Sequence, residues 1–311
     1  MIYRWKYALA VTRSTPVSKR LLIRPVRSTS SAAVTASNLV ICDINTKNGA
    51  FWRHFSFPLL ILLASVSGTS YARCAPDHID EHVSIKYVHD GDTVILSDRR
   101  KLRIIGIDTP ELATKKRAAE PLAEQAGEAL RTLVRQHKQQ LYLRFDSVRL
   151  DPYERMLAHA FLADGTNLSE HLLHNGLATI LTLPPNVWQA ECYLNAETSA
   201  RRENKGIWAL KSHQPITVGQ LNKDHTGFHV VRNPVGDVKR TPKADYIYLS
   251  DTQNRTRLRI KIDAQDRVYF PKNLLNDLIG KKIEVRGIVH KHRNGFFMRL
   301  HHPVALQILS Q

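Results

Sequence analysis

Long apolar runs are almost absent from this chain of 311 residues, which excludes a protein that crosses the membrane several times. The single apolar run, at residues 55–66, is shorter than the ~20 residues that span hydrocarbon. Only 14 glycines and 14 prolines occur, which excludes a collagen-like chain. Because 43% of the residues are hydrophobic and 23% are charged, we expect a folded, soluble protein.

Acidic residues are outnumbered, with 28 Asp and Glu against 45 Lys and Arg, and the imbalance is uneven along the chain. Residues 1–72 hold nine bases and one acid, residues 73–214 hold 19 of each, and residues 215–311 hold 17 bases and eight acids. These shifts predict a leader at 1–72, one domain at 73–211 and a basic domain at 215–311. The basic domain suits a polyanion such as nucleic acid, although a solvated basic surface explains the charge equally well.

The leader contains the features of a secretory signal. Arg53 and His54 precede the apolar run, and Ser70-Tyr71-Ala72 supplies small residues at a cleavage site. The sequence therefore predicts export to the periplasm or the exterior and no permanent membrane span. An organelle transit peptide is the alternative, because the first forty residues are rich in Arg and Ser and poor in acids.

Cysteine is scarce, with three residues in the whole chain. Cys42 would leave with the leader, so Cys74 and Cys192 would remain. An even pair in an exported protein is typical of a disulfide, and two unrelated thiols are the alternative.

Apolar and polar residues alternate in five segments after the leader, with a helical pattern inserted after the third. Two more helical patterns follow, the first capped by Asn167 and the second stopped near Gly206. This order predicts a five-stranded barrel of the OB type with three helices. The expected strands are residues 83–88, 93–96, 101–107, 141–145 and 157–162.

The basic domain shows a second series of alternating segments, interrupted by a short helical pattern at 274–279. We therefore expect another small, OB-like β-barrel. Its aromatic residues could form stacking platforms for nucleic acid, although strand aromatics pack in cores by default. The expected strands are residues 216–221, 228–232, 246–249, 257–262, 282–289, 295–300 and 304–309.

Three short motifs carry the candidate chemistry. They are His-Asp-Gly-Asp-Thr at 89–93, Leu-Arg-Ile-Ile-Gly-Ile-Asp-Thr-Pro-Glu at 102–111, and Asp-Pro-Tyr-Glu-Arg at 151–155. Each alone is compatible with an ordinary turn or strand. Together, their order and content resemble the staphylococcal nuclease (thermonuclease) family over residues 82–210, and Gly206-Ile207-Trp208 is similar to the end of that family's last helix.

This resemblance implies a Ca²⁺ site made by Asp92, Asp108 and the main-chain carbonyl of Thr109, with Asp90 outside the first ligand shell. Hard oxygen donors are the ligands that Ca²⁺ prefers. No cysteine lies in these motifs, and their single histidine, His89, is not part of the implied set, which argues against zinc.

The resemblance also implies catalytic roles for three charged residues. Glu111 would position a water molecule, and Arg103 and Arg155 would grip the scissile phosphate. The implied reaction is Ca²⁺-dependent hydrolysis of DNA and RNA that leaves 3′-phosphates. Tyr153 would contact the substrate near the phosphate, and Lys115 and Lys116 would attract the backbone unless their loop is merely solvated.

Two departures from the family pattern are visible. Glu154 stands where the family usually has Gly, and residues 182–185 lie where the prototype has tyrosines that pack on the nucleotide. A barrel of this kind that has lost catalysis would be a nucleic-acid-binding module, which is the alternative function. We expect a monomer.

Overall fold

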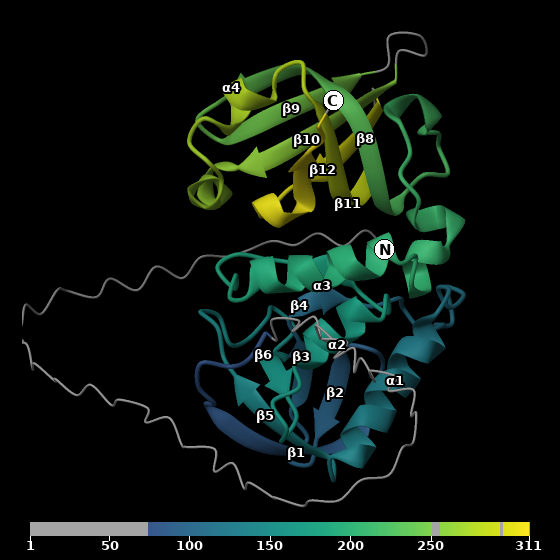
Figure 1. The fold of residues 1–311 in the computed structure, drawn as a ribbon, viewed down its shortest axis with the longest axis vertical. Helices are drawn as coiled ribbons and strands as arrows, with labels where there is room; N and C mark the ends of the chain where they lie inside the picture. Colours follow the sequence, from purple (N-terminus) through teal and green to yellow (C-terminus); the bar gives the residue numbers. More distant parts are fainter. Residues whose placement is uncertain (1–73, 251–255, 293–294, 311) are drawn as a thin grey trace, which may run out of the picture. The chain divides into compact units, whose positions relative to one another are not determined.

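The computed structural model describes residues 74–250, 256–292 and 295–310, which form two small barrels within one compact unit. Figure 1 shows the first barrel in blue to teal and the second in green to yellow. The expected leader, with its signal and cleavage site, lies outside the described residues. Within the described part, no helix is both long and apolar enough to cross a membrane.

The first barrel is the expected five-stranded OB fold. Its strands close in the order β1-β2-β3-β6-β5, and all neighbours are antiparallel except the parallel pair β3 and β6. Alternation along β3 buries Leu102 and Ile104 in the core and turns Arg103 outward. The strands are β1 (Glu81–Val88), β2 (Thr93–Leu96), β3 (Lys101–Ile104), β5 (Gln140–Arg144) and β6 (Met156–Phe161).

Three helices accompany this barrel, as expected: α1 (Ala123–Gln136), α2 (Leu168–His174) and α3 (Ala190–Arg202). The side chain of Asn167 caps α2 by accepting a hydrogen bond from the backbone of Glu170. The short strands β4 (Gly106–Asp108) and β7 (Thr179–Leu181) pair to form a separate two-stranded antiparallel sheet. Sequence patterns did not indicate β7, which is only three residues long.

The strand expected at 101–107 is broken in two. Gly106 adopts φ +90°, and a Cβ there would lie 2.4 Å from the ring of Tyr193. Only glycine fits this turn, so the chain bends after β3 and pairs next with β7. The bend delivers Asp108 and Thr109 to the end of β4, where the candidate site begins.

The second barrel repeats the topology of the first. Its strands close in the order β8-β9-β10-β12-β11, and again only the pair of third and fifth strands, β10 and β12, is parallel. This confirms the expected second barrel. Its strands are β8 (Gly227–Arg240), β9 (Ala244–Ser250), β10 (Arg257–Asp263), β11 (Lys282–His292) and β12 (Gly295–Arg299), with β13 (Leu306–Ile308) added beside β11 and α4 (Leu274–Leu278) before it.

One expected strand of this barrel is wrong. Residues 216–221 form the 3₁₀ helix η3 (Val218–Gln220), because Thr217 and Gln220 make a reciprocal capping box that closes a turn. The other 3₁₀ helices are η1 (Gly206–Ala209), η2 (Lys211–His213), η4 (Ala264–Tyr269) and η5 (Pro303–Ala305).

Buried charges link α3 to β11. Glu284, 1% exposed, accepts ion pairs from Arg201 at 2.7 Å and from Arg232 at 2.8 Å, and Arg286 lies 3.4 Å from Glu197. Glu197 is fully buried and also accepts the backbone N–H of Ile180. Removing one partner of such a group leaves an uncompensated buried charge, which costs about 3–5 kcal/mol.

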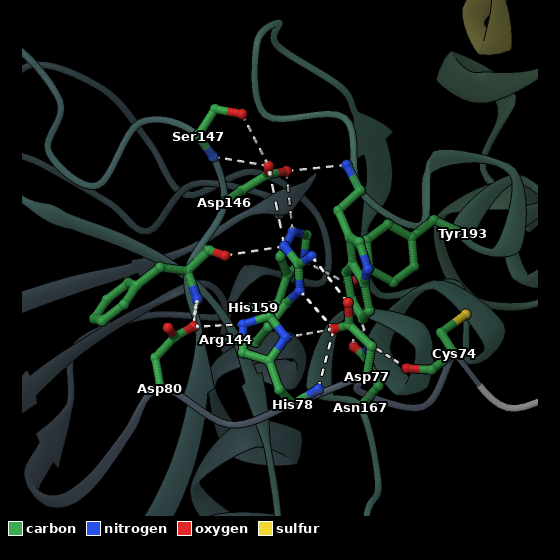
Figure 2. Close-up of polar contacts among 12 residues, drawn as sticks. Cys74, Asp77, His78, Asp80, Arg144, Asp146, Ser147, His159, Asn167 and Tyr193 are labelled. Carbon is green, nitrogen blue, oxygen red and sulfur yellow. Dashed lines mark hydrogen bonds and ion pairs between the residues drawn. The ribbon is translucent and has the colours of Figure 1, made fainter. Parts of the chain in front are cut away.

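A disulfide joins Cys74 to Cys192, with 5.8 Å between the two Cα atoms. Beside it lies the polar network of Figure 2, in which Asn167 donates to the carbonyl of Cys74 and the Tyr193 hydroxyl lies 2.7 Å from Nδ1 of His159. The network attaches residues 74–80 to the barrel, and Arg144 extends it with an ion pair to Asp77 at 2.9 Å.

Candidate active site

Asp92 anchors the first motif and is almost completely buried, with 6% of its surface exposed. Its Oδ1 accepts the hydroxyl of Thr93 at 3.0 Å, and its Oδ2 accepts the backbone N–H and the hydroxyl of Thr109 at 3.1 and 3.0 Å. This close approach needs Gly91, where a Cβ would lie 2.8 Å from both Ala126 Cβ and Thr109 Oγ1. The first two motifs are therefore joined directly.

Arg103 bridges two aspartates. One of its terminal nitrogens lies 3.0 Å from Asp92 Oδ2 and 3.0 Å from Asp108 Oδ1, and the other donates to the carbonyl of Ile104. Burial alone would lower the pKa of Arg103, but the charges of Asp92 and Asp108 raise it. The guanidinium therefore stays positive in a site where only 11% of its side chain is exposed.

Negative charge is in excess around Arg103. Burial raises the pKa of Asp108, Asp90 and Glu111, and the Asp92 charge adds to each shift. The charge of Arg103 lowers the pKa of Asp108, and the charge of Arg117 lowers that of Glu111, but neither cancels the increase. We call Asp90, Asp92, Asp108 and Glu111 the acidic cluster. The Arg103 guanidinium does not neutralise all of these carboxylates, so the cluster favours the binding of a further cation.

Glu111 is held by the loop that follows it. Its backbone exchanges hydrogen bonds with Glu120, and its carboxylate lies 3.2 Å from Arg117. Lys115 and Lys116 occupy the exposed turn between Thr114 and Arg117. Arg117, at the end of this turn, thus directs its guanidinium to the Glu111 carboxylate, a pairing that the sequence analysis did not predict.

Arg155 is positioned by an aspartate that the sequence analysis did not single out. Asp151 accepts the backbone N–H groups of Tyr153 and Arg155 with Oδ1, and the Arg155 side chain with Oδ2 at 2.6 Å. The signal available in the sequence was an Asp followed by Pro, which favours such a turn. Glu154, between them, adopts φ 61°, and this left-handed backbone accounts for the family's preference for Gly.

Arg155 is the residue immediately before β6, which pairs with the strand that carries Arg103. In the parallel pair β3 and β6, Arg103 lies opposite Leu157, two residues beyond Arg155. Because side chains two apart in an extended chain share a face, we infer that Arg155 lies on the same side of the barrel as Arg103. Within the described residues, no ion pair or hydrogen bond connects Arg155 to the acidic cluster; its guanidinium lies 5.8 Å from the half-exposed ring of Tyr153.

The donor set of the acidic cluster suits a hard cation. Asp108 leaves 45% of its side chain exposed, and its Oδ2 has no hydrogen bond or ion pair to the described residues. Among the residues described, no group of three or more His, Cys, Asp or Glu side chains is arranged to hold a metal ion. A Ca²⁺ ion would complete its shell with carbonyl, water and substrate oxygens.

Comparison with known proteins identifies the family of this region. The model of the family described as "Staphylococcal nuclease homologue" matches residues 101–210, which include Arg103, Asp108, Glu111 and Arg155. A thermonuclease of Staphylococcus hyicus is 31% identical over 127 residues, covering 39% of this chain and 72% of that protein. This chain belongs to the staphylococcal nuclease family.

Two further relatives extend the comparison of this staphylococcal nuclease family member. A thermonuclease of Staphylococcus intermedius is 29% identical over 143 residues, covering 44% of this chain and 82% of that protein. A protein named probable endonuclease LCL3 from Komagataella phaffii is 27% identical over 128 residues, covering 39% of this chain and 54% of its own length.

Proposed function

We propose that this chain is a calcium-dependent nuclease that hydrolyses phosphodiester bonds of DNA and RNA and leaves 3′-phosphates. The observation that carries the proposal is Arg103, fixed at 3.0 Å from both Asp92 and Asp108 beside an excess of carboxylate. A buried guanidinium held by two carboxylates next to exposed hard oxygen donors suits a phosphodiester, which needs both a cation and planar N–H donors.

The calcium ligands in this proposal are Asp92, Asp108 and the carbonyl of Thr109. A carboxylate has about four lone-pair directions, so Asp92 Oδ1 keeps one after accepting from Thr93. When bound, Ca²⁺ would act as a Lewis acid beside the phosphate. Its charge would also oppose the rise in the pKa of Asp108, which burial and the Asp92 charge cause.

The two arginines would stabilise negative charge on the phosphate as the nucleophile adds. Arg103 needs no reorganisation for this role, because Asp92 and Asp108 already fix its guanidinium. Arg155 is fixed through Asp151, with 23% of its side chain exposed toward solvent. Donors that are positioned before the reaction account for a large part of the stabilisation of such transition states.

Glu111 would orient the attacking water and accept its proton. Burial and neighbouring carboxylates raise the pKa of Glu111, which makes it a better base than a free carboxylate. Its ion pair with Arg117 at 3.2 Å is exposed, with 49% of the Arg117 side chain and 54% of the Glu111 side chain accessible, and exposed pairs of this kind contribute about 0–1 kcal/mol. The pair can therefore open to admit a water molecule.

The deciding experiment incubates the mature protein with plasmid DNA or single-stranded RNA, in Ca²⁺ and in excess EGTA. We expect cleavage only with Ca²⁺, and no cleavage by Asp108→Ala. The fragments should accept extension by a polymerase only after phosphatase removes their 3′-phosphates. Digestion that persists in EGTA would refute the calcium assignment, extension without phosphatase would refute the product, and binding without cleavage would establish the non-catalytic alternative.

We also propose that the protein is exported and monomeric. The Cys74–Cys192 disulfide supports export, because such bonds persist in oxidising compartments. N-terminal sequencing of protein from the cell exterior or periplasm should begin at Arg73, and light scattering should give the monomer mass. A full-length, cell-retained chain would contradict export.

A further inference from the structure

The second barrel presents an outward face of three rings and three cations on adjacent strands. In the central parts of β9, β10 and β12, buried hydrophobic residues alternate with partly exposed residues that face away from the barrel core. We call these outward residues the aromatic–basic face: Tyr246, Tyr248, Arg259, Lys261, Phe297 and Arg299.

Strand register places these side chains next to one another. Arg259 lies opposite Tyr248 on one side and Phe297 on the other, and in the next row Lys261 lies between Tyr246 and Arg299. The face is thus two rows across three strands, because β10 pairs with both β9 and β12. Outward aromatic side chains cannot be explained by the barrel core, which lies on the other side of the same strands.

The rings and the central guanidinium lie close together and remain partly exposed to solvent. The Tyr246 and Tyr248 ring centroids lie 6.3 Å apart at an interplanar angle of 28°, and the Arg259 guanidinium lies 5.7 Å from Tyr246 and 5.5 Å from Phe297. One terminal nitrogen of Arg259 lies 3.4 Å from Nε2 of His292, and no carboxylate of the described residues pairs with this guanidinium. A ligand with an anionic oxygen would pair with the accessible N–H groups of this guanidinium.

Charge around the face favours an anion. β11 adds Lys291 beside β12, and the domain as a whole holds 17 bases and eight acids. Among the described residues, the neighbouring acids are Asp263, which pairs with Lys261 and Arg299, and Asp237, which lies opposite Tyr248. Within this part of the chain, Arg259 is therefore the cation of the face that no carboxylate compensates.

We propose that the aromatic–basic face binds single-stranded nucleic acid, with bases stacking on Tyr246, Tyr248 and Phe297 and a phosphate on Arg259. Unpaired bases expose their faces to such rings, whereas a duplex hides them, so a single strand fits this face and a duplex does not. An acidic protein or a sulfated polysaccharide would use the cations and leave the rings without a role. The inference does not depend on the nuclease reaction.

The test measures binding of a fluorescent 12-nucleotide single strand to the mature protein in excess EGTA, by anisotropy over a range of salt. Tyr248→Ala and Phe297→Ala should each weaken binding roughly tenfold, and Arg259→Ala should weaken it and reduce the salt dependence by about one phosphate contact. Tyr248→Leu and Phe297→Leu keep apolar packing while removing the ring face, so their weakened binding would show a stacking role rather than a folding defect.

Matched controls remove an exposed tyrosine and an exposed lysine from other surfaces. Tyr87→Ala, on β1, and Lys272→Ala, before α4, should bind as the parent does. The proposal would be overturned if a 12-base-pair duplex bound as tightly as the single strand, or if the control variants lost as much affinity as the face variants. It would also be overturned if heparin competed equally well with and without the ring substitutions. Cleavage of a dinucleotide in Ca²⁺ by the same variants should be unchanged, so a failed nuclease and a failed binding face give different results.

Discussion

Arg155 is the residue whose removal tests the proposed phosphate grip most directly. Its guanidinium is fixed by Asp151 at 2.6 Å, so it is ready to donate before a substrate arrives. Arg155→Ala should lower kcat about a hundredfold or more, because loss of one positioned donor costs roughly 3 kcal/mol of transition-state stabilisation. Single-turnover cleavage of a short oligonucleotide in saturating Ca²⁺ measures this directly.

The matched control for this substitution is Arg149→Ala. Arg149 is exposed on the same connection and lies over the Phe145 ring at 4.6 Å. Its removal should leave kcat within about twofold, since exposed pairs contribute little. Near-normal turnover by Arg155→Ala would show that this arginine does not contact the phosphate.

Glu154 carries a local strain that glycine would remove. A non-glycine residue at φ 61° costs about 1 kcal/mol. Glu154→Gly should therefore raise the free energy of unfolding by about 1 kcal/mol in urea titrations. Glu154→Ala removes the charge but keeps the Cβ, and an equal gain from it would assign the effect to charge instead of backbone conformation.

The sequence predicted the main residues of the candidate site but not the side chains that hold them. Asp92, Arg103, Asp108 and Thr109 stand in ordered motifs, and the fold does bring them into contact. The pairing of Glu111 with Arg117 depends on how a ten-residue loop closes, which no local pattern specifies. Roles in substrate binding for Tyr153, Lys115 and Lys116 stay predictions.

At the scale of elements, β6 carries a buried histidine that makes stability depend on pH. Burial lowers the pKa of His159 despite Asp146, whose carboxylate lies 3.7 Å away. Below pH ~6.5 the imidazole of His159 therefore binds a proton in the unfolded chain but not in the folded protein. The free energy of unfolding falls as the pH drops below that value. Melting temperatures at pH 7 and pH 5 should differ more in the parent than in His159→Gln.

Asp146 adds a second loss at lower pH. Burial would raise its pKa, but contact with His159 and the backbone N–H groups of Trp188 and Ser147 lower it to about 2. Its contribution to stability is present above pH ~4 and is lost as the pH falls toward 2.

The control for the His159 experiment is His82→Gln, at an exposed position of β1. A parent protein that becomes more stable at pH 5 would contradict the neutral state of His159.

Strands with strict alternation were predictable, and those shaped by tertiary contacts were not. The segment at β2 was predicted to the residue, and β9 and β10 within two residues of each end, because each buries one face of a sheet. The break at Gly106 follows from the ring of Tyr193, 87 positions further along the chain. The η3 turn forms in place of a strand because the side chains of Thr217 and Gln220 each accept a hydrogen bond from the other residue's backbone N–H.

At the scale of the whole molecule, the disulfide closes a loop between residues 118 positions apart. A cross-link over that distance removes unfolded-state entropy equivalent to about 4–5 kcal/mol. The Cys74→Ser/Cys192→Ser double variant should lose about 3–5 kcal/mol of unfolding free energy in urea, and dithiothreitol should change the parent in the same direction. Equal stability of the two proteins would show that the bond is dispensable for folding.

The link between α3 and β11 limits what truncation can show. A chain ending near Lys211 would lose Arg286 and with it the ion pair of Glu197. Any fall in activity would then combine loss of the second barrel with damage to the first. Point substitutions on the aromatic–basic face separate these effects, because those side chains do not contact α3 through any ion pair or hydrogen bond of the described residues.

The exposed turn at Lys115 and Lys116 lies inside the segment that Cys74 and Cys192 enclose. A trypsin-like protease that nicks this turn would produce two polypeptides that remain one covalent molecule. Such a nicked protein would migrate as a single band without reductant and as two bands with it. A single scission at this turn would therefore release no fragment.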